Sequence, residues 1–227
     1  FTFIALGGDL SNVQGLGQRP GQTFLGTGDF DGDGRSDAVF QVDANGFVMV
    51  LHGGDPKEAQ GAGIQSGRTL IGIGDTQGDG ADDLIFQTDA TGFVAILDDA
   101  DPNAPLGSGR QTDNTLLAIA DFNGDGTEDL LWEKDSTDFA YYFASGDPTR
   151  QSVIGDQTGQ TLQAIADFNG DGAADLLWRT DSTGFTRIVD GSDPTQSTGL
   201  GSRDGQTLLG VGDFDGNGQA DAIFRND

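Results

Sequence analysis

A repeat of 46 residues is the feature that most constrains how this chain can fold. Five similar nonapeptides recur at that spacing, and their first residues are Asp29, Asp75, Asp121, Asp167 and Asp213. They read DFDGDGRSD, DTQGDGADD, DFNGDGTED, DFNGDGAAD and DFDGNGQAD. A Thr precedes each nonapeptide by six residues, and an aromatic residue follows its first Asp by eleven. A fixed period of this length is typical of repeat proteins, in which each repeat forms one supersecondary unit.

Each repeat predicts four short strands. In the first complete repeat the apolar runs are TFLGTGDF, DAVFQV and GFVMVL, and a weaker run precedes the next QT pair. Runs of this length, rich in β-branched and aromatic residues and bounded by Gly, Asn and Asp, indicate strands. No segment has a sustained 3.6-residue pattern, so we expect little helix. Four strands in one such period are typical of a blade of an all-β propeller.

The two ends of the chain predict a closed five-bladed β-propeller with four-stranded blades. Phe1 aligns with the start of a third strand, because Asp9 follows it at the same interval as in the complete repeats. Asp227 aligns with Asp43, where a second strand ends. We therefore expect one domain over residues 1–227, in which the N-terminal half-blade completes the C-terminal blade and leaves no open edge. The alternative is an open array or part of a larger ring. Without an initiator Met, the chain reads as a mature piece or an excised segment.

The amino-acid composition excludes several classes of binding partner and several kinds of site. The chain carries 37 acidic and 11 basic side chains, a net charge of −26, which disfavours nucleic acid and anionic membrane surfaces as partners. No stretch approaches roughly 18 continuous apolar residues, so membrane insertion is not expected. The lack of Cys excludes disulfides and zinc–thiolate sites. The single His, His52, follows a strand end, where we expect a surface position.

The nonapeptides have the pattern of a calcium site. Their consensus, D-x-[DN]-x-[DN]-G-x-x-D, offers side-chain oxygens at positions 1, 3, 5 and 9, and its Gly permits the sharp turn that brings the main-chain carbonyl of position 7 to the same centre. About six or seven oxygens suit Ca²⁺ better than Mg²⁺. An EF-hand is excluded, since position 12 is aromatic in all five loops where an EF-hand has Glu. The alternative is a set of Asx turns that bind no metal.

The predicted sites are the loops 29–37, 75–83, 121–129, 167–175 and 213–221, with up to five Ca²⁺ ions, one per blade. The predicted ligands are Asp29, Asp31, Asp33, Arg35, Asp37, Asp75, Gln77, Asp79, Ala81, Asp83, Asp121, Asn123, Asp125, Thr127, Asp129, Asp167, Asn169, Asp171, Ala173, Asp175, Asp213, Asp215, Asn217, Gln219 and Asp221. Position 7 contributes only its main-chain carbonyl. The first loop, with four carboxylates, is expected to bind best, and the second, with Gln77 at position 3, to bind most weakly.

These loops resemble a known family. The segments GDFDGDG…DAVF and ADFNGDG…DLLW, with GF at the third strands, are similar to the FG-GAP repeats of integrin-type propellers and closest to the variety called VCBS repeats. The resemblance implies a calcium-loaded, extracellular and non-catalytic propeller that serves in adhesion, as a lectin or as a module of a secreted enzyme. Integrin-like and lectin members usually have seven blades, so five would be a departure.

The function expected from the sequence is binding. We expect an extracellular or cell-surface module for binding or adhesion, with a glycan or protein ligand on the face opposite the calcium loops. A purely structural module of a larger surface protein, filament or secreted enzyme is the alternative. Loops of this kind, with dissociation constants on the order of 10⁻⁴–10⁻³ M, fill at extracellular calcium levels. No organic cofactor and no catalytic residue is expected: only Glu133 breaks the repeat on a strand, which is little support for a glycosidase.

The sequence also predicts the surroundings of four aromatic or basic residues outside the loops. Trp132 and Trp178 replace Phe in a repeat-fixed column, so we expect both in the core. Tyr141 and Arg187 occupy a variable column. One interpretation is that they line a pocket between blades. The other is that they are ordinary packing residues and that Arg187 pairs with an acid.

Overall fold

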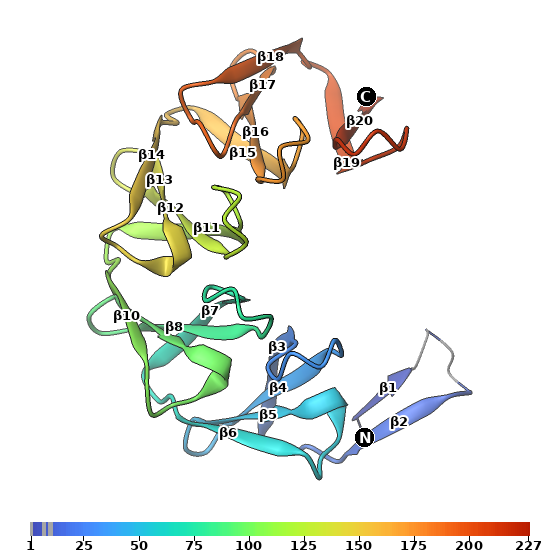
Figure 1. Cartoon of the computed structure of the whole chain (residues 1–227), viewed down its shortest axis with the longest axis vertical. Coiled ribbons are helices and arrows are strands. Elements are labelled where there is room, and N and C mark those ends of the chain that lie inside the picture. Colours follow the sequence, from blue (N-terminus) through green and yellow to red (C-terminus); the bar gives the residue numbers. More distant parts are fainter. Residues whose placement is uncertain (1, 6–7, 9–10) are drawn as a thin grey trace. The chain divides into compact units, whose positions relative to one another are not determined.

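The computed structural model of the protein describes residues 2–5, 8 and 11–227 (Figure 1). The described strands are antiparallel and form six sheets, four with four strands and two with two. The all-β class and the four-stranded repeat are therefore confirmed. The chain divides into two compact units, Phe1–Thr112 and Asp113–Asp227, each with two of the four-stranded sheets. Within the described residues, no helix is long and apolar enough to cross a membrane.

Each four-stranded sheet takes four consecutive strands of one repeat. The first contains β3 (Gln22–Gly28), β4 (Asp37–Val42), β5 (Phe47–Leu51) and β6 (Ala59–Ile64). The second contains β7 (Arg68–Gly74), β8 (Asp83–Thr88), β9 (Phe93–Leu97) and β10 (Leu106–Arg110). The third contains β11 (Asn114–Ala120), β12 (Asp129–Lys134), β13 (Phe139–Phe143) and β14 (Gln151–Asp156). The fourth contains β15 (Gln160–Ala166), β16 (Asp175–Thr180), β17 (Phe185–Val189) and β18 (Ser197–Ser202).

The two-stranded sheets are the first and last described strand pairs. β1 (Thr2–Ala5) pairs with β2 (Val13–Gly17), and β19 (Gln206–Gly212) pairs with β20 (Asp221–Asn226). The sequence alignment assigns the first pair to strands three and four of a repeat and the last pair to strands one and two. The phase predicted for each end is thus observed, although Phe1 and Asp9, on which part of that alignment rests, lie outside the described residues. The union of the two pairs in a fifth blade stays a prediction.

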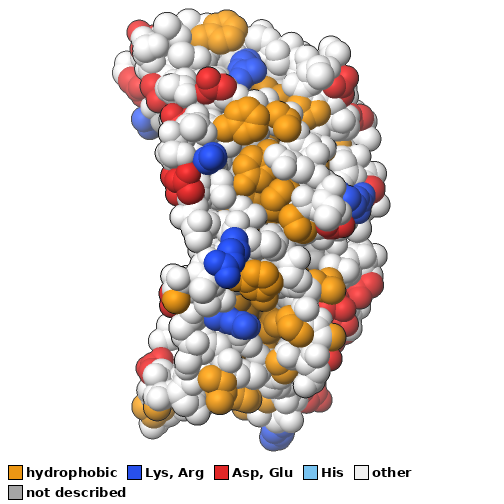
Figure 2. Space-filling model, turned by 90° about the vertical axis from the view of Figure 1, so that its left-hand side faces the viewer, with side chains coloured by type: hydrophobic (Ala, Val, Ile, Leu, Met, Phe, Trp, Pro, Cys, Tyr) orange, Lys and Arg blue, Asp and Glu red, His pale blue; other side chains and the backbone are white. Residues whose placement is uncertain are grey.

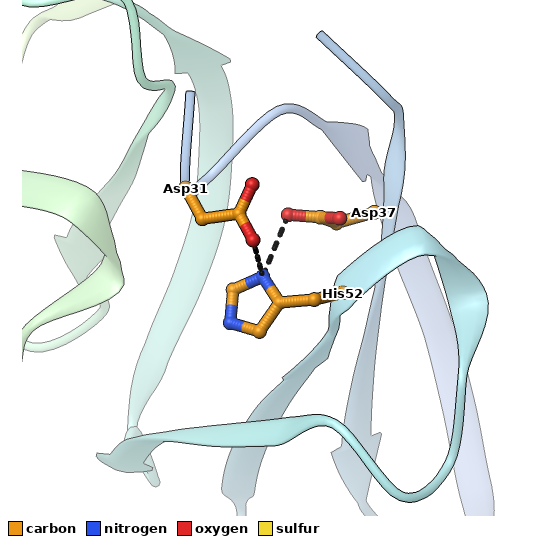
Figure 3. A group of neighbouring side chains, drawn as sticks. All are labelled: Asp31, Asp37 and His52. Carbon is orange, nitrogen blue, oxygen red and sulfur yellow. Dashed lines mark hydrogen bonds and ion pairs between the residues drawn. The ribbon is translucent and has the colours of Figure 1, made fainter. Parts of the chain in front are cut away.

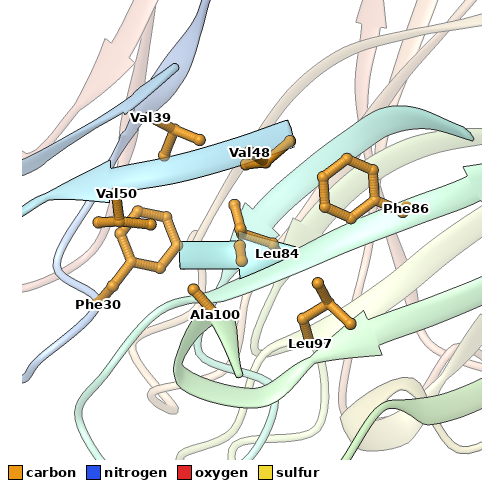
Figure 4. Packing of buried hydrophobic residues seen from close by; sticks show 9 residues of the cluster. Phe30, Val39, Val48, Val50, Leu84, Phe86, Leu97 and Ala100 are labelled. Atoms are coloured by element: carbon orange, nitrogen blue, oxygen red, sulfur yellow. The ribbon is translucent and has the colours of Figure 1, made fainter. Parts of the chain in front are cut away.

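Alternate residues of the second strand pack on opposite faces of the sheet. In β4, Val39 joins a buried cluster with the next sheet, whereas Ala38 and Phe40 pack with Leu16 of β2. Both faces of this strand are covered, which is why its sequence is apolar without alternation. Figure 4 shows the first cluster, where Phe30, Val39, Val48 and Val50 meet Leu84, Phe86, Leu97 and Ala100. Burial of these side chains holds the two sheets together.

The second unit repeats this packing with larger side chains. Its cluster joins Phe122, Leu131 and Tyr142 of one repeat to Leu176 and Trp178 of the next. Trp132 and Trp178 are each 1% exposed, so the prediction that both belong to the core is confirmed.

The repeated Thr column has a defined structural role. In all five repeats its hydroxyl donates a hydrogen bond to a carboxylate 20 residues later, at 2.8–2.9 Å. The acceptors are Asp43, Asp89, Asp135, Asp181 and Asp227. The bond joins the start of the first strand to the end of the second, so it fixes the register of that hairpin.

The GF column packs against glycines of the fourth strand. A Cβ placed at Gly107 or Gly199 would lie 2.9 Å from the Cζ atom of Phe93 or Phe185, closer than side chains approach. Both Phe rings remain about 40% exposed. Figure 2 shows hydrophobic side chains at the surface of one side of the protein, with acidic side chains toward its borders.

Tyr141 and Arg187 are packing residues. Tyr141 is 9% exposed, and its ring lies 5.3 Å from that of Phe143. Arg187 donates hydrogen bonds to Gln160 Oε1 at 3.1 Å and Gln157 Oε1 at 3.0 Å. The expectation that Arg187 pairs with an acid is therefore wrong: neutral amide oxygens take that role.

Candidate metal centres in the strand-connecting loops

The five acidic loops join the first strand of each repeat to the second, and all five fold in the same way. The Oδ2 atom of the position 1 Asp accepts the N–H of the Gly at position 6, at 2.8–2.9 Å in every loop. These Gly residues have φ between +83° and +93°, a left-handed conformation that other residues rarely adopt. The side chain at position 5 accepts the N–H of position 7 at 2.7–3.1 Å. The loop backbone thus curls around its own acidic side chains.

In the first four loops the position 9 carboxylate is buried and ties the loop to a second turn. Asp37, Asp83, Asp129 and Asp175 are at most 1% exposed. One oxygen of each accepts the N–H of position 2, at 2.9–3.0 Å. The other accepts an N–H from the turn that follows the third strand, at 2.7–3.2 Å. In three repeats that turn is a short 3₁₀ segment: η2 (His52–Gly54), η3 (Asp98–Ala100) or η4 (Ala144–Gly146).

Burial makes two of these carboxylates, Asp83 and Asp129, hard to ionise without a cation. It raises the pKa of Asp83 to about 6, although Thr76 and the main chain of Asp99 donate hydrogen bonds to this group. Burial likewise raises the pKa of Asp129 to about 6, and the charges of Asp125 and Asp121 add to the shift. A divalent cation in either loop would act in the opposite direction and stabilise the ionised form.

In two loops the structure groups three predicted ligands. One carboxylate oxygen from each of Asp29, Asp31 and Asp33 lies within 4.8 Å of the others in the first loop. Asp213, Asp215 and Asp221 form the corresponding group in the fifth. Carboxylates so close repel one another, and a hard cation between them removes the repulsion. The donor set and its spacing therefore fit Ca²⁺.

His52 belongs to the first loop rather than to the surface. Its side chain is 17% exposed, and Nδ1 lies 3.0 Å from Asp37 Oδ2 and 3.3 Å from Asp31 Oδ2 (Figure 3). Nε2 lies 3.1 Å from Gln60 Oε1. Burial lowers the pKa of His52, but the hydrogen bond to Asp37 and the charges of Asp37 and Asp31 outweigh it and raise the pKa above its usual value. The predicted surface position is wrong because η2 folds back over the loop.

The second loop gathers acids that the sequence analysis missed. Asp79 lies in a group of three with Asp98 and Asp99, which belong to η3 and not to the loop. Gln77, the predicted ligand at position 3, donates from Nε2 to Thr76 Oγ1 at 3.1 Å. The sequence contains one signal for this group: the other complete repeats have Gly53, Ser145 and Gly191 where Asp99 stands.

The third and fourth loops are arranged differently. Asn123 Nδ2 donates to both oxygens of Asp129, at 3.0 and 3.1 Å, and Arg150 Nη2 lies 3.1 Å from Asp125 Oδ2. In the fourth loop Asn169 Nδ2 donates to Asp171 and to Asp190, at 3.1 and 3.2 Å. Among the described residues, neither loop has three acidic or histidine side chains gathered as in the first.

Neighbouring loops within a unit are connected through the main chain. The carbonyl oxygen of Asp29 accepts the N–H of Asp82 at 2.5 Å, and that of Asp121 accepts the N–H of Ala174 at 2.7 Å. Glu133, considered above for catalysis, lies away from these loops on β12, paired with Thr115 and Ala140. Burial raises the pKa of Glu133, and the charges of Asp138 and Asp135 add to the shift.

Antiparallel four-stranded repeats with acidic loops between their first two strands define a β-propeller-like repeat protein. Residues 121–178 match the family of FG-GAP-like repeats, and they include the third and fourth loops. This match agrees with the resemblance drawn from the sequence and covers about a quarter of the chain. No curated protein matches the chain.

Two solved structures share the fold. A lectin of Agrocybe aegerita, studied for its recognition of non-reducing terminal N-acetylglucosamine, is 16% identical with a TM-score of 0.57. The match covers 89% of this chain and 60% of the lectin chain, so the protein spans less than two thirds of that relative. A chain of a nidogen/laminin complex is 10% identical with a TM-score of 0.52, over 91% of this chain and 74% of that chain. At these identities the likeness concerns the fold alone.

Proposed function

We propose that the protein is a calcium-binding, non-catalytic β-propeller of the extracellular space that acts as a binding module. Calcium binding is supported above all by the geometry of the first loop, where oxygens of Asp29, Asp31 and Asp33 lie within 4.8 Å of one another. Asp37 and the main-chain carbonyl of Arg35 would complete the ligand set. Weak sites of this type bind with dissociation constants on the order of 10⁻⁴–10⁻³ M and fill only at extracellular calcium levels.

Calcium removal tests this part of the proposal. Thermal unfolding is compared in excess calcium and in chelator, and bound ions are counted by elemental analysis. An ion that binds only the folded protein adds about 2.7 kcal/mol when present at a hundredfold excess over its Kd. For a domain of this size 1 kcal/mol corresponds to about 2–4 °C, so several ions should raise the midpoint by tens of degrees. No bound ion and no shift would leave the loops as Asx turns.

The proposed binding surface is the end of the sheets opposite the calcium loops. There the turn between strands two and three meets the connection from strand four to the next repeat: Gln65 N donates to Gly46 O at 2.8 Å, and Gln111 N to Gly92 O at 2.8 Å. The four-to-one connections differ in sequence between repeats, which suits a surface whose specificity is tuned on a constant scaffold.

A glycan is the proposed ligand class, and the fold shared with a lectin supports it. A glycan array probed with labelled protein, with and without calcium, tests the assignment. Binding that is lost in chelator would agree with it. A specific protein neighbour in cross-linking, with no glycan signal, would favour the second candidate, a structural module of a larger surface assembly.

We further propose that β1–β2 and β19–β20 form one blade, giving a ring of five. Each pair lacks two strands of the repeat, and each leaves apolar side chains exposed that are buried in the complete sheets. Ile223, 41% exposed, is equivalent to Val39, which is fully buried, and Phe214, 61% exposed, is equivalent to Phe30, which is 1% exposed. Association of the two pairs would cover such surface.

A further inference from the structure

The second loop draws its acidic side chains from two elements. Gln77 at position 3 offers no carboxylate, and its amide donates to Thr76. Asp79 at position 5 is grouped with Asp98 and Asp99, one oxygen from each lying within 4.8 Å of the others. Asp98 and Asp99 stand in η3, after the third strand of the same sheet. No other residue of the second loop belongs to this group.

The backbone of η3 is fixed over the loop. Asp99 N donates to Asp83 Oδ1 at 3.2 Å, and Asp99 O accepts from Gln60 Nε2 at 2.7 Å. Asp99 has φ +49°, a left-handed conformation that Gly53 and Ser145 also adopt at the equivalent places of the first and third complete repeats. A residue other than Gly is strained in this conformation. The strain is therefore common to Asp99 and Ser145, and the feature specific to Asp99 is its carboxylate.

Asp98 and Asp99 each bury an oxygen that nothing in the described structure satisfies. The Oδ1 atoms of both are buried and have no hydrogen-bond partner. A buried acceptor left unpaired is destabilising, and more so when it is charged. The position 9 carboxylates contrast with this, because both of their oxygens accept backbone N–H groups. A cation shared with Asp79 would place a positive charge beside both carboxylates.

The first residue of this turn varies with the loop that it faces. The residues equivalent to Asp98 in the other complete repeats are His52, Ala144 and Asp190. The first loop, which has Asp31 at position 3, faces a histidine; the second, which has an uncharged residue there, faces Asp98. The third loop faces Ala144, and the guanidinium of Arg150 already lies on its position 5 carboxylate. The carboxylate missing from the second loop thus has a substitute in the adjoining turn.

We propose that Asp98 and Asp99 are calcium ligands of the second site, where they take the place of the absent position 3 carboxylate. This inference rests on the proposed function, that the loops bind calcium. It reverses the expected order of the sites: the second becomes a full site, and the third, which has Arg150 as its own cation, becomes the weakest.

The test compares calcium binding by the whole chain and five variants, with Ca²⁺ itself as the probe. Isothermal titration gives the affinities, and native mass spectrometry counts the ions. Asp98→Asn and Asp99→Asn, singly and together, remove the charges with little change of shape. Asp101→Asn is the matched control, because it removes one carboxylate close by in the sequence but outside the group. Thermal unfolding in chelator checks that each variant is folded.

We expect the double variant to bind one ion fewer than wild type, or to bind one ion at least tenfold more weakly, while Asp101→Asn binds as wild type. Adding Gln77→Asp to the double variant should restore the lost ion, since it returns a carboxylate to position 3. Unchanged number and affinity in the double variant would overturn the inference and leave the calcium proposal standing. No calcium bound by wild type would overturn the proposed function itself.

Discussion

Among single residues, the position 9 aspartates have two roles, as predicted calcium ligands and as hydrogen-bond acceptors that hold the loop, and the sequence pattern indicates only the first. The pattern identifies them as calcium ligands. The structure adds that the first four, Asp37, Asp83, Asp129 and Asp175, each accept backbone N–H groups from their own loop and from the turn after the third strand. A carboxylate with this arrangement fixes the loop before any ion binds. Its burial also sets a pH dependence that differs between the calcium-free and calcium-bound protein.

Stability without calcium should rise as the pH falls from 7 to 5. The pKa of Asp83 and Asp129 is raised by burial from 3.8 to about 6, so the folded state binds these protons more tightly than the unfolded state. The gain develops as the pH falls through about 6 toward about 4 and is absent above that range. We expect the midpoint of thermal unfolding of the calcium-free protein to increase by about 5 °C.

The calcium-loaded protein provides the contrast. Protons compete with the ion for the same carboxylates, so its midpoint should fall over the same pH interval. Scanning calorimetry of both forms at pH 7, 6 and 5 measures the two trends. A rise in both forms would contradict calcium binding by the position 9 aspartates.

Some residues of the loops could be predicted from the sequence, and some of their neighbours could not. The spacing of the loops identified Asp29, Asp31 and Asp33, because ligands on one short loop are close in space whatever the rest of the fold does. His52, Asp98 and Asp99 were missed as neighbours of the loops. They lie 15 or 16 residues beyond position 9, across a strand and a turn, and their proximity depends on how η2 and η3 fold back.

At the scale of elements, period and composition predicted the strands well. Four strands per repeat, the loop between the first two and the core position of Trp132 all follow from columns that keep their register. The hydrogen-bond partners of individual side chains could not be predicted from these columns. Arg187 donates hydrogen bonds to Gln157 and Gln160. Both glutamines stand in columns that recur in other repeats, but Arg187 is alone in its column, so the repeat does not show that these three residues meet.

Trp132 should tolerate replacement by the residue that other repeats use. Its indole Nε1 is buried without a hydrogen-bond partner among the described residues. Trp132→Phe loses packing volume but removes this unsatisfied donor, so we expect a change of no more than about 1 kcal/mol. Leu131→Ala, on the opposite face of the same strand and fully buried, should cost about 3 kcal/mol. Urea unfolding in excess calcium measures both, and equal losses would show that the indole N–H carries no penalty.

At the scale of the whole molecule, a pocket in the first unit bears on the proposed fifth blade. It has a volume of about 490 Å³, and its lining includes Thr2, Ile4, Phe24, Ala38 and Phe40. The equivalents of Phe24, Ala38 and Phe40 in the next repeat are Leu70, Leu84 and Phe86. Leu84 and Phe86 belong to one buried cluster with Phe30 and Val39 (Figure 4), and Leu70 packs against that cluster. Phe214 and Ile223 are the repeat equivalents of Phe30 and Val39. The pocket is therefore the place that the fifth blade would fill.

A cysteine pair can test this closure in a chain that has no cysteine of its own. Gln41 pairs with Val48 between the second and third strands of the first complete sheet. The same register in a fifth blade brings Arg225 opposite Thr2, and paired residues of antiparallel strands, about 4.5–5.5 Å apart at Cα, are within reach of a disulfide. We expect Thr2→Cys/Arg225→Cys to oxidise to an intramolecular disulfide in nearly all molecules, as seen by mass and by mobility on a non-reducing gel. Thr2→Cys/Arg179→Cys is the control, since Arg179 holds the same column in a sheet that is already complete, and it should stay reduced. Disulfide-linked dimers would mean that the terminal pairs complete blades with other chains. No bond in the first variant would mean that the ring does not close within one chain.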